Sequence, residues 1–365
     1  MRYVLASLVV ALLFTQHVRA DDDKKDKPKT AKEQFEALMM DIEKAQADAG
    51  KAFRAAKTDK EKAEVRPAFM KKLQDMTPKM LDLAEKNPKD PIAGEALLFV
   101  MSVSPDAAMQ EKASNLLLKE QPERVPEACM MLSQSGNPKA DAFFNNVIQS
   151  KDSSNKSKAF ATLGQASLAK NQLQMSDPQS PEAKALSKKA EDLYEQIISK
   201  YKDVKEAFAA AEGELFVLRN LSIGKVAPDI EGEDGDGKKF KLSEYRGKVV
   251  VLDFWALWCG PCMALVPHEI KLVKRLEGKP FAMVGVDFDA TKEELKKGEK
   301  ENGIIWRSFH DGRQGPIGEK WHISAIPAIY VLDAKGVIRF KDVREKALDE
   351  AVDVLLKEMG VDLKN

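Results

Sequence analysis

The chain has 365 residues, of which 44% are hydrophobic, and its 58 basic residues equal its 58 acidic residues in number. This length suits two domains of ordinary size, and the composition is typical of a globular chain that buries a core. The balanced charge removes the electrostatic reason to expect a nucleic-acid partner. Three cysteines would be few if disulfides held an exported protein of this size together.

Residues 1–20 have the three parts of a secretory signal peptide. Arg2 precedes an apolar stretch over residues 3–14, and residues 18–20 end in a small side chain before an acidic run. The apolar stretch is shorter than the roughly 20 residues that a membrane-spanning helix needs. We therefore expect cleavage after Ala20, export to a bacterial periplasm, and a mature chain that does not span the membrane.

Residues 21–30 are charged and contain no apolar anchor, which predicts a disordered linker. Residues 31–222 lack an alternating strand pattern and are rich in Ala, Leu, Lys, Glu and Met. This pattern predicts an all-α domain of helical hairpins. Its clearest helix start is Ser180, an N-cap serine that Pro181 follows at the first helical position.

A faint repeat runs through this helical region. Glu95 and Glu127 open similar stretches at a spacing close to that of two-helix repeats of the tetratricopeptide kind, although the aromatic and glycine signature of that family is missing. Cys129 lies in an apolar stretch nearby. Its surroundings favour a buried, inert thiol over a role in thiol exchange.

The segment Trp258-Cys259-Gly260-Pro261-Cys262 follows an apolar run over residues 249–252. That run predicts a buried parallel strand that leads into a helix. Two thiols separated by two residues at such a junction can open and close a disulfide without large backbone movement. The sequence therefore predicts thiol–disulfide exchange.

Elementary electrostatics assigns the two thiols different roles. Cys259 is the predicted nucleophile, because a helix N-terminus lowers a thiol pKa from about 8.5 toward roughly 7. Cys262, one turn further and more enclosed, is the predicted resolving thiol. Zinc is the alternative for a CxxC pair, but it needs four ligands, and no second CxxC or histidine pair stands nearby. We expect no metal and no bound cofactor.

Residues 224–360 resemble the exported TlpA/ResA-like branch of the thioredoxin superfamily, with a domain of the AhpC/TSA-redoxin type. Besides the cysteine segment, the shared motifs are Ala227-Pro228-Asp229, Gly235-Asp236-Gly237-Lys238, residues 242–248 and Asp333-Ala334-Lys335-Gly336. The resemblance implies an α/β thioredoxin-like fold over residues 223–365, with a mostly parallel central sheet flanked by helices. An added helix after residues 281–286 is expected to begin at a capping box on Thr291.

The resemblance also implies roles for single residues. Asp253 corresponds to the buried aspartate that moves a proton to and from the resolving cysteine, and burial would raise its pKa. Pro327 corresponds to the cis-proline that faces the dithiol, and the Ile326 backbone would pair with an extended substrate. Trp258 would shape the docking surface together with Gly260 and Pro261.

This sequence departs from the pattern of that branch at two places. Many relatives carry Thr or Val where Ile326 stands, and a glycine often follows the last strand where this chain has Asp342-Val343-Arg344-Glu345. The resemblance further implies electrons from a membrane thiol reductase of the DsbD or CcdA kind and disulfide-containing exported proteins as substrates. It leaves both cytochrome c maturation and broader disulfide repair open.

Two other functions compete with disulfide reduction. A peroxiredoxin-type peroxidase would need Thr or Ser three residues before its reactive cysteine, and Ala256 stands there. In the second alternative, the helical domain is the functional part and binds a partner or a component of the cell envelope. The thioredoxin-like domain would then be a redox-sensitive accessory.

Overall fold

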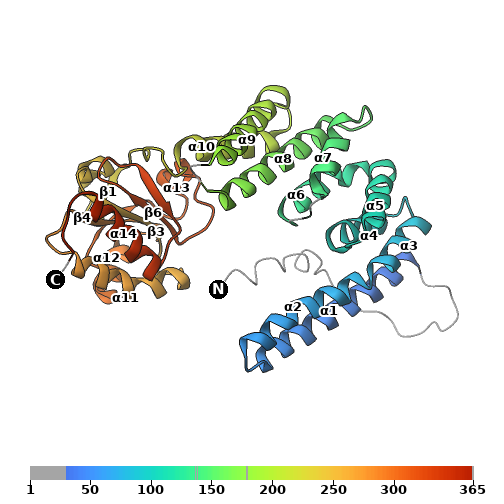
Figure 1. The fold of residues 1–365 in the computed structure, drawn as a ribbon, viewed down its shortest axis with the longest axis horizontal. Helices are drawn as coiled ribbons and strands as arrows, with labels where there is room; N and C mark the ends of the chain where they lie inside the picture. The colour runs from blue at the N-terminus through green and yellow to red at the C-terminus, as the bar shows by residue number, and fades with distance from the viewer. Residues whose placement is uncertain (1–29, 136, 138, 178–179, 364–365) are drawn as a thin grey trace. The chain divides into compact units, whose positions relative to one another are not determined.

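The computed structural model describes residues 30–135, 137, 139–177 and 180–363. They form two compact units, one ending at Ala211 and the other beginning at Glu212 (Figure 1). The expected signal peptide and residues 21–29 of the expected linker lie outside the described residues. Among the helices that the structure describes, none combines the length and apolar character needed to cross a bilayer.

The first unit consists of helices in its described part, as the sequence predicts. The helices are α1 (Ala31–Ala55), α2 (Asp59–Gln74), α3 (Thr77–Lys86), α4 (Pro91–Val103), α5 (Ala107–Glu120), the short 3-10 helix η2 (Pro122–Arg124), α6 (Val125–Ser135), α7 (Ala140–Gln149), α8 (Asn155–Met175) and α9 (Pro181–Lys200). Helix α10 (Lys205–Asn220) begins in this unit and continues into the next.

Polar caps fix where these helices begin. Thr30 and Thr58 each accept a hydrogen bond from the third residue of their helix and receive the reciprocal bond of a capping box. Ser180 accepts a hydrogen bond from the Ala183 backbone N–H at 3.0 Å, so the predicted start of α9 is confirmed. Consecutive helices then pack pairwise, α3 with α4 and α8 with α9 among them.

The second unit combines a sheet with helices. Its elements are β1 (Glu231–Glu233), β2 (Lys239–Lys241), the 3-10 helix η3 (Leu242–Tyr245), β3 (Val249–Trp255), α11 (Gly260–Arg275), β4 (Phe281–Asp287), α12 (Lys292–Asn302), β5 (Arg307–His310), α13 (Pro316–Lys320), β6 (Ala328–Leu332), β7 (Ile338–Lys341) and α14 (Lys346–Glu358). Helix α12 starts at the predicted capping box on Thr291.

The main sheet has the strand order β5-β4-β3-β6-β7. Strands β3, β4 and β5 are parallel neighbours, whereas β6 is antiparallel to both β3 and β7. Strand β6 therefore runs against the other four strands, which agrees with the mostly parallel α/β sheet that the sequence predicts. Strands β1 and β2 form a separate antiparallel pair, so the turn between them is a hairpin turn.

Strand β3 is buried along its whole length, which explains why its residues other than Asp253 are apolar. Arg275 of α11 donates a hydrogen bond to Asp353 of α14 at 2.9 Å. The Phe254 ring of β3 packs against Trp321 and Tyr330, on the sheet face opposite to Asp253 because successive strand side chains alternate. Helix α11 begins shortly after this buried central strand ends.

The end of α10 belongs to the core of the second unit. Leu221, directly after the helix, is fully buried in this core, and Phe216 packs against it. The Phe216 ring lies 5.4 Å from the His322 ring, centroid to centroid. The sequence predicts that the second domain begins at residue 223. Phe216 and Leu221, which precede that residue, already contribute to the core of the second unit.

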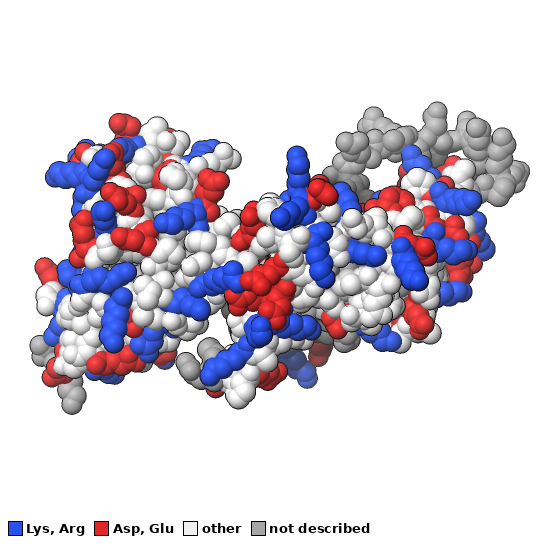
Figure 2. Space-filling model, turned by 90° about the horizontal axis from the view of Figure 1, so that it is seen from above, with Lys and Arg blue, Asp and Glu red and all other residues white. Residues whose placement is uncertain are grey.

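Basic and acidic side chains are interspersed on the face of the molecule drawn in Figure 2. This distribution matches the equal numbers of the two charges in the sequence.

Candidate active site

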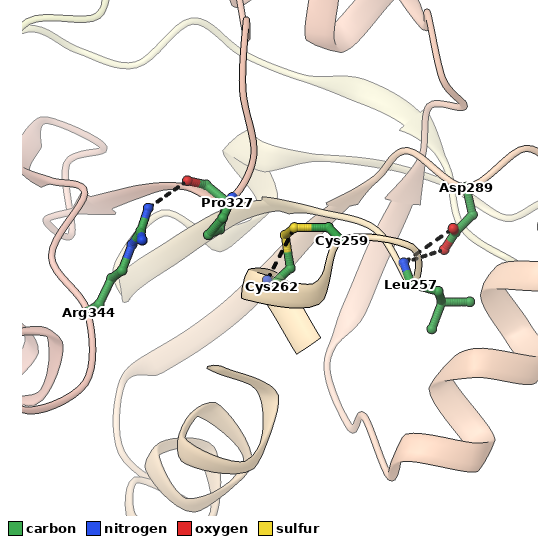
Figure 3. Close-up of a disulfide and its surroundings, with 6 residues drawn as sticks. All are labelled: Leu257, Cys259, Cys262, Asp289, Pro327 and Arg344. Atoms are coloured by element: carbon green, nitrogen blue, oxygen red, sulfur yellow. Dashed lines mark hydrogen bonds between the residues drawn. A yellow bond between two sulfur atoms is a disulfide. The ribbon is translucent and has the colours of Figure 1, made fainter. Parts of the chain in front are cut away.

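A disulfide between Cys259 and Cys262 lies at the first turn of α11, with an S–S distance of 2.04 Å (Figure 3). Cys259 is the N-cap of the helix, and its Sγ accepts a hydrogen bond from the Cys262 backbone N–H at 3.2 Å. Pro261 occupies one of the first helical positions, where its missing N–H costs no helix bond. The same N–H donor and the helix dipole would stabilise a Cys259 thiolate after reduction.

The two cysteines are buried, whereas their chain neighbours Trp258, Gly260 and Pro261 are exposed. Cys259 is 6% exposed and Cys262 is 2% exposed, so the order of enclosure is the predicted one and the difference is small. Trp258 is 56% exposed, and Gly260 and Pro261 are exposed as well. An incoming disulfide would therefore meet these three residues first.

Pro327 lies beside the disulfide, and the peptide bond between Ile326 and Pro327 is cis, as the resemblance implies (Figure 3). Arg344 donates a hydrogen bond from Nη2 to the Pro327 carbonyl at 3.1 Å. Arg344 belongs to the segment in which relatives often carry glycine. Asp342 and Glu345 in that segment adopt the left-handed backbone conformation that glycine prefers, with φ of 54° and 50°.

Asp253 lies in the middle of β3, between Gly285 of β4 and Ile329 of β6, and is 3% exposed. Burial raises its pKa from 3.8 to about 7, while the positive charge of Arg344 acts in the opposite direction. Its Oδ1 atom has no hydrogen-bond partner among the described residues. A carboxyl group in this state can take up and release a proton near neutral pH.

A pair of aspartates at the carboxyl end of β4 was not predicted from the sequence. Asp289 accepts hydrogen bonds from the Leu257 backbone N–H at 3.1 and 3.2 Å, which holds the residue just before Trp258 (Figure 3). Asp287 lies 3.0 Å from Nδ1 of His310, and burial, followed by its hydrogen bond to Asp289, raises the pKa of Asp287. The available signal was two aspartates at the end of an apolar strand parallel to β3.

Glu269 was likewise not predicted from the sequence. This residue is 1% exposed and lies on the buried face of α11, which it shares with Cys262, Leu265, Val266 and Leu272. Burial raises its pKa well above the ordinary value, and the negative charge of Asp253 adds to that effect. A charged residue within an otherwise apolar helix stripe was the signal that could have identified it.

No group of three or more His, Cys, Asp or Glu side chains within the described ranges is arranged to hold a metal ion. Each of three histidines contacts a neighbouring side chain. His268 lies near Asp349, His310 lies near Asp287, and the His322 ring packs against Phe216. The site brings together two sulfurs and a buried carboxyl group.

Residues 223–341 match the AhpC/TSA family. The chain is 34% identical to the thioredoxin-like protein YneN of Bacillus subtilis over 126 residues, which cover 32% of this chain and 68% of that protein. It is 26% identical to the thiol-disulfide oxidoreductase ResA of Bacillus thuringiensis over 152 residues, which cover 42% of this chain and 87% of ResA.

Solved structures are also similar to part of this chain. The thioredoxin domain of a thiol-disulfide oxidoreductase from Bacteroides vulgatus is 30% identical, with 38% of this chain and 99% of that chain covered and a TM-score of 0.35. A thiol:disulfide interchange protein from a Bacteroides species is 29% identical, with 37% and 91% covered and a TM-score of 0.35.

Proposed function

This chain belongs to the TlpA/ResA-like branch of the thioredoxin superfamily and is a thiol-disulfide oxidoreductase, and from that premise we propose that it reduces disulfides of exported proteins. The observation that carries the proposal is the Cys259–Cys262 pair at the start of α11. Gly260 and Pro261 separate the two sulfurs and bring no cation that would hold the pair in the thiolate form. The pair is therefore suited to give electrons away.

The proposed reaction has two steps. The Cys259 thiolate attacks one sulfur of a substrate disulfide, a Cys259–substrate disulfide forms, and the second substrate sulfur leaves as a thiolate. Cys262 then loses its proton, its sulfur attacks Cys259, and the first substrate sulfur leaves. The enzyme is oxidised to the Cys259–Cys262 disulfide while the substrate gains two electrons and two protons.

The exposed residues around the disulfide supply the proposed docking surface. Trp258 offers a large apolar face next to the nucleophile, and Gly260 and Pro261 leave space for a polypeptide to approach. The Ile326 backbone makes no hydrogen bond within the described part of the chain, so it is available to pair with an extended substrate. These features favour a polypeptide disulfide over a small molecule.

The proposed location and electron supply rest on other parts of the protein. The features of residues 1–20 support export, since they match a secretory signal. An exported reductase needs electrons from across the membrane, and we propose a membrane thiol reductase of the DsbD or CcdA kind as their source. The buried, apolar Ala256 supports disulfide exchange over a peroxidase, because it offers no hydroxyl group near Cys259.

Trapping of the mixed disulfide tests this proposal. With Cys262→Ser the first step can occur but the second cannot, so we expect covalent complexes at Cys259 that a reductant releases. The variant chain is expressed in a bacterium with residues 1–20 retained, and the captured proteins are identified by mass spectrometry.

Cys259→Ser is the matched control, because it retains one thiol of the pair but lacks the nucleophile. We expect exported, disulfide-containing proteins in the first sample and their absence from the second. Equal capture by the two variants would contradict the assignment of Cys259, and capture of cytoplasmic proteins alone would contradict export.

A further inference from the structure

The turn over residues 256–259 connects the buried strand β3 to the helix that Cys259 caps. The Cys259 backbone N–H donates a hydrogen bond to the Ala256 carbonyl at 3.1 Å, which closes the turn. Leu257 and Trp258 are its two central residues. The position of this turn therefore determines where the Cys259 sulfur and the exposed Trp258 side chain lie.

Asp289 holds the backbone of this turn. Its two carboxyl oxygens accept hydrogen bonds from the Leu257 N–H at 3.1 and 3.2 Å (Figure 3). Asp289 is 3% exposed, so these bonds are shielded from water, which strengthens them. The contact joins the chain just before the nucleophile to the segment that follows β4.

Asp289 is itself fixed by its neighbours. Its backbone N–H donates a hydrogen bond to Oδ1 of Asp287 at 3.2 Å, and Oδ2 of Asp287 lies 3.0 Å from Nδ1 of His310. Asp287 and His310 end the neighbouring strands β4 and β5 and are paired in the sheet. The contacts therefore run from the carboxyl ends of two strands to the turn that follows a third.

Gly298 of α12 holds the side chain of Leu257. Gly298 is buried, and a Cβ atom at this position would overlap with the end of the Leu257 side chain. The leucine thus occupies the space that an alanine methyl group would need. Glycine weakens a helix relative to alanine, so its place in α12 is explained by this close approach.

We propose that Asp289 and Gly298 are positioning residues for the nucleophile: one fixes the backbone of Leu257, the other fixes its side chain, and together they keep Cys259 at the N-terminus of α11. The inference deepens the proposed function and rests on the assignment of Cys259 as the attacking thiol. It adds no step to the reaction.

The position of Cys259 matters because a helix N-terminus stabilises a thiolate only within its first turn. Cys259 is the N-cap of α11, and its Sγ accepts a hydrogen bond from the Cys262 N–H at 3.2 Å. A turn that is free to move would take Cys259 out of this position for part of the time. The fraction of Cys259 present as thiolate near neutral pH would then fall, and its attack on a disulfide would slow.

Alkylation of Cys259 by iodoacetamide measures this fraction in the full, reduced chain, and mass spectrometry identifies the alkylated residue. Asp289→Asn and Asp289→Ala both remove the carboxyl group, but Asn keeps a carbonyl oxygen that can accept the Leu257 N–H bond. We expect the Ala variant to react about two to ten times more slowly than the Asn variant at pH 7, the factor that corresponds to one hydrogen bond. The midpoint of its pH profile should also move to higher pH.

Gly298→Ala provides an independent test if Asp289→Ala does not fold. The added methyl group displaces the Leu257 side chain, so we expect alkylation of Cys259 to slow by about twofold or more. In a Leu257→Ala background the space is free. The same substitution at Gly298 should then have no effect, because the two residues act through one contact.

Asp333→Ala is the matched control. Asp333 also accepts two backbone N–H bonds, from Lys335 and Val337 at 2.9 and 3.0 Å. It directly follows β6, whereas Pro327 directly precedes that strand, so Asp333 lies at the end of β6 away from the site. We expect this substitution to lower the stability of the protein in urea without changing the pH profile of Cys259.

The outcomes separate this inference from the proposed function. Equal alkylation rates in Asp289→Asn and Asp289→Ala, or an equal effect of Gly298→Ala with and without the Leu257 side chain, would overturn the inference and leave thiol exchange intact. An equal change of the pH profile in Asp333→Ala would also overturn it, because any loss of stability would then suffice. A wild-type protein in which Cys262 is alkylated before Cys259 would contradict the proposed function and, with it, the inference.

Discussion

At the scale of single residues, buried carboxyl groups determine how the site responds to pH. Asp253 is enclosed between two strands, and its pKa rises from 3.8 to about 7 because burial disfavours the charged form. A group with a raised pKa in the folded state favours folding most below its ordinary pKa. That contribution is lost as the pH rises toward the folded-state value.

The Asp253→Asn variant tests this dependence. Between about pH 4 and pH 7 the unfolded wild-type chain has released the proton of Asp253 while the folded chain keeps it, so the free energy of unfolding falls by up to about 1.4 kcal/mol per pH unit. Asn does not titrate. We therefore expect the stability of the variant relative to wild type to rise over this range and to level off above it.

Urea unfolding followed by tryptophan fluorescence measures this difference, because all four tryptophans, at positions 255, 258, 306 and 321, lie in the second unit. Both proteins are kept oxidised, so that thiol ionisation does not contribute. A stability difference that stays constant from pH 4 to pH 8 would contradict the raised pKa.

The sequence could predict those site residues that motifs mark. Cys259 and Cys262 follow from their spacing after an apolar strand, the cis bond at Pro327 follows from the resemblance, and the burial of Asp253 follows from its apolar strand. Glu269 was not predicted, because its burial depends on how α11 packs in the folded chain and no local pattern around it shows that packing. The contact of Arg344 with Pro327 likewise joins segments whose proximity only the fold reveals.

At the scale of elements, close approach between α7 and α8 shapes the helical unit. The Phe144 ring of α7 is fully buried and lies over Gly164 of α8. A Cβ atom at position 164 would lie 2.6 to 2.9 Å from atoms of that ring. The absent side chain at Gly164 therefore makes room for a large aromatic group.

Gly164→Ala measures how much this fit contributes. Alanine favours a helix over glycine by about 1 kcal/mol, whereas an extra methyl group in a packed core costs about 1–3 kcal/mol. Because the Phe144 ring is fully buried, we expect the packing cost to exceed the helix gain, with a net loss of up to about 2 kcal/mol in the free energy of unfolding. Circular dichroism at 222 nm during urea unfolding measures the change.

Gly50→Ala is the matched control in a helix. The nearest atoms to a Cβ at Gly50 belong to the flexible guanidinium of Arg54, at 3.5 Å or more. We expect this substitution to stabilise the protein by about 0.5–1 kcal/mol. An equal gain from both substitutions would show that the Phe144 ring does not limit the packing of α8.

The sequence predicted the elements themselves better than their partners. Caps such as Ser180 and Thr291 mark helix starts locally, so they could be identified without the fold. Which helices pack together depends on contacts between distant segments. Gln121, for example, donates hydrogen bonds to the carbonyls of Pro88 and Asp90. No local sequence pattern predicts these contacts between segments about 30 residues apart.

At the scale of the whole molecule, the boundary between the two units lies within α10. The second half of this helix belongs to the unit that contains Cys259 and Cys262, called the redox unit below. Leu221 is fully buried in the redox core, and Phe216 packs on His322. The order of a helical domain and a thioredoxin-like domain was predictable from composition and motifs. The place of the division was not, because the helical pattern of α10 continues without a break across Glu212.

Two fragments test where the redox unit begins. A fragment of residues 212–365 retains Phe216 and Leu221, whereas one of residues 223–365 loses both. Burial of a leucine side chain contributes about 1.5–3 kcal/mol, so we expect the longer fragment to be more stable by at least that amount. Urea unfolding followed by tryptophan fluorescence makes the comparison, and equal stabilities would place the boundary after α10.

The burial of Cys129 has a consequence for the fidelity of the enzyme. This residue is fully enclosed in α6, and burial alone raises the pKa of its thiol far above that of an exposed cysteine. A sulfur that stays protonated and out of contact cannot capture an intermediate meant for Cys262. The protein thus carries an odd number of cysteines without the risk of mispairing that an accessible third thiol would bring.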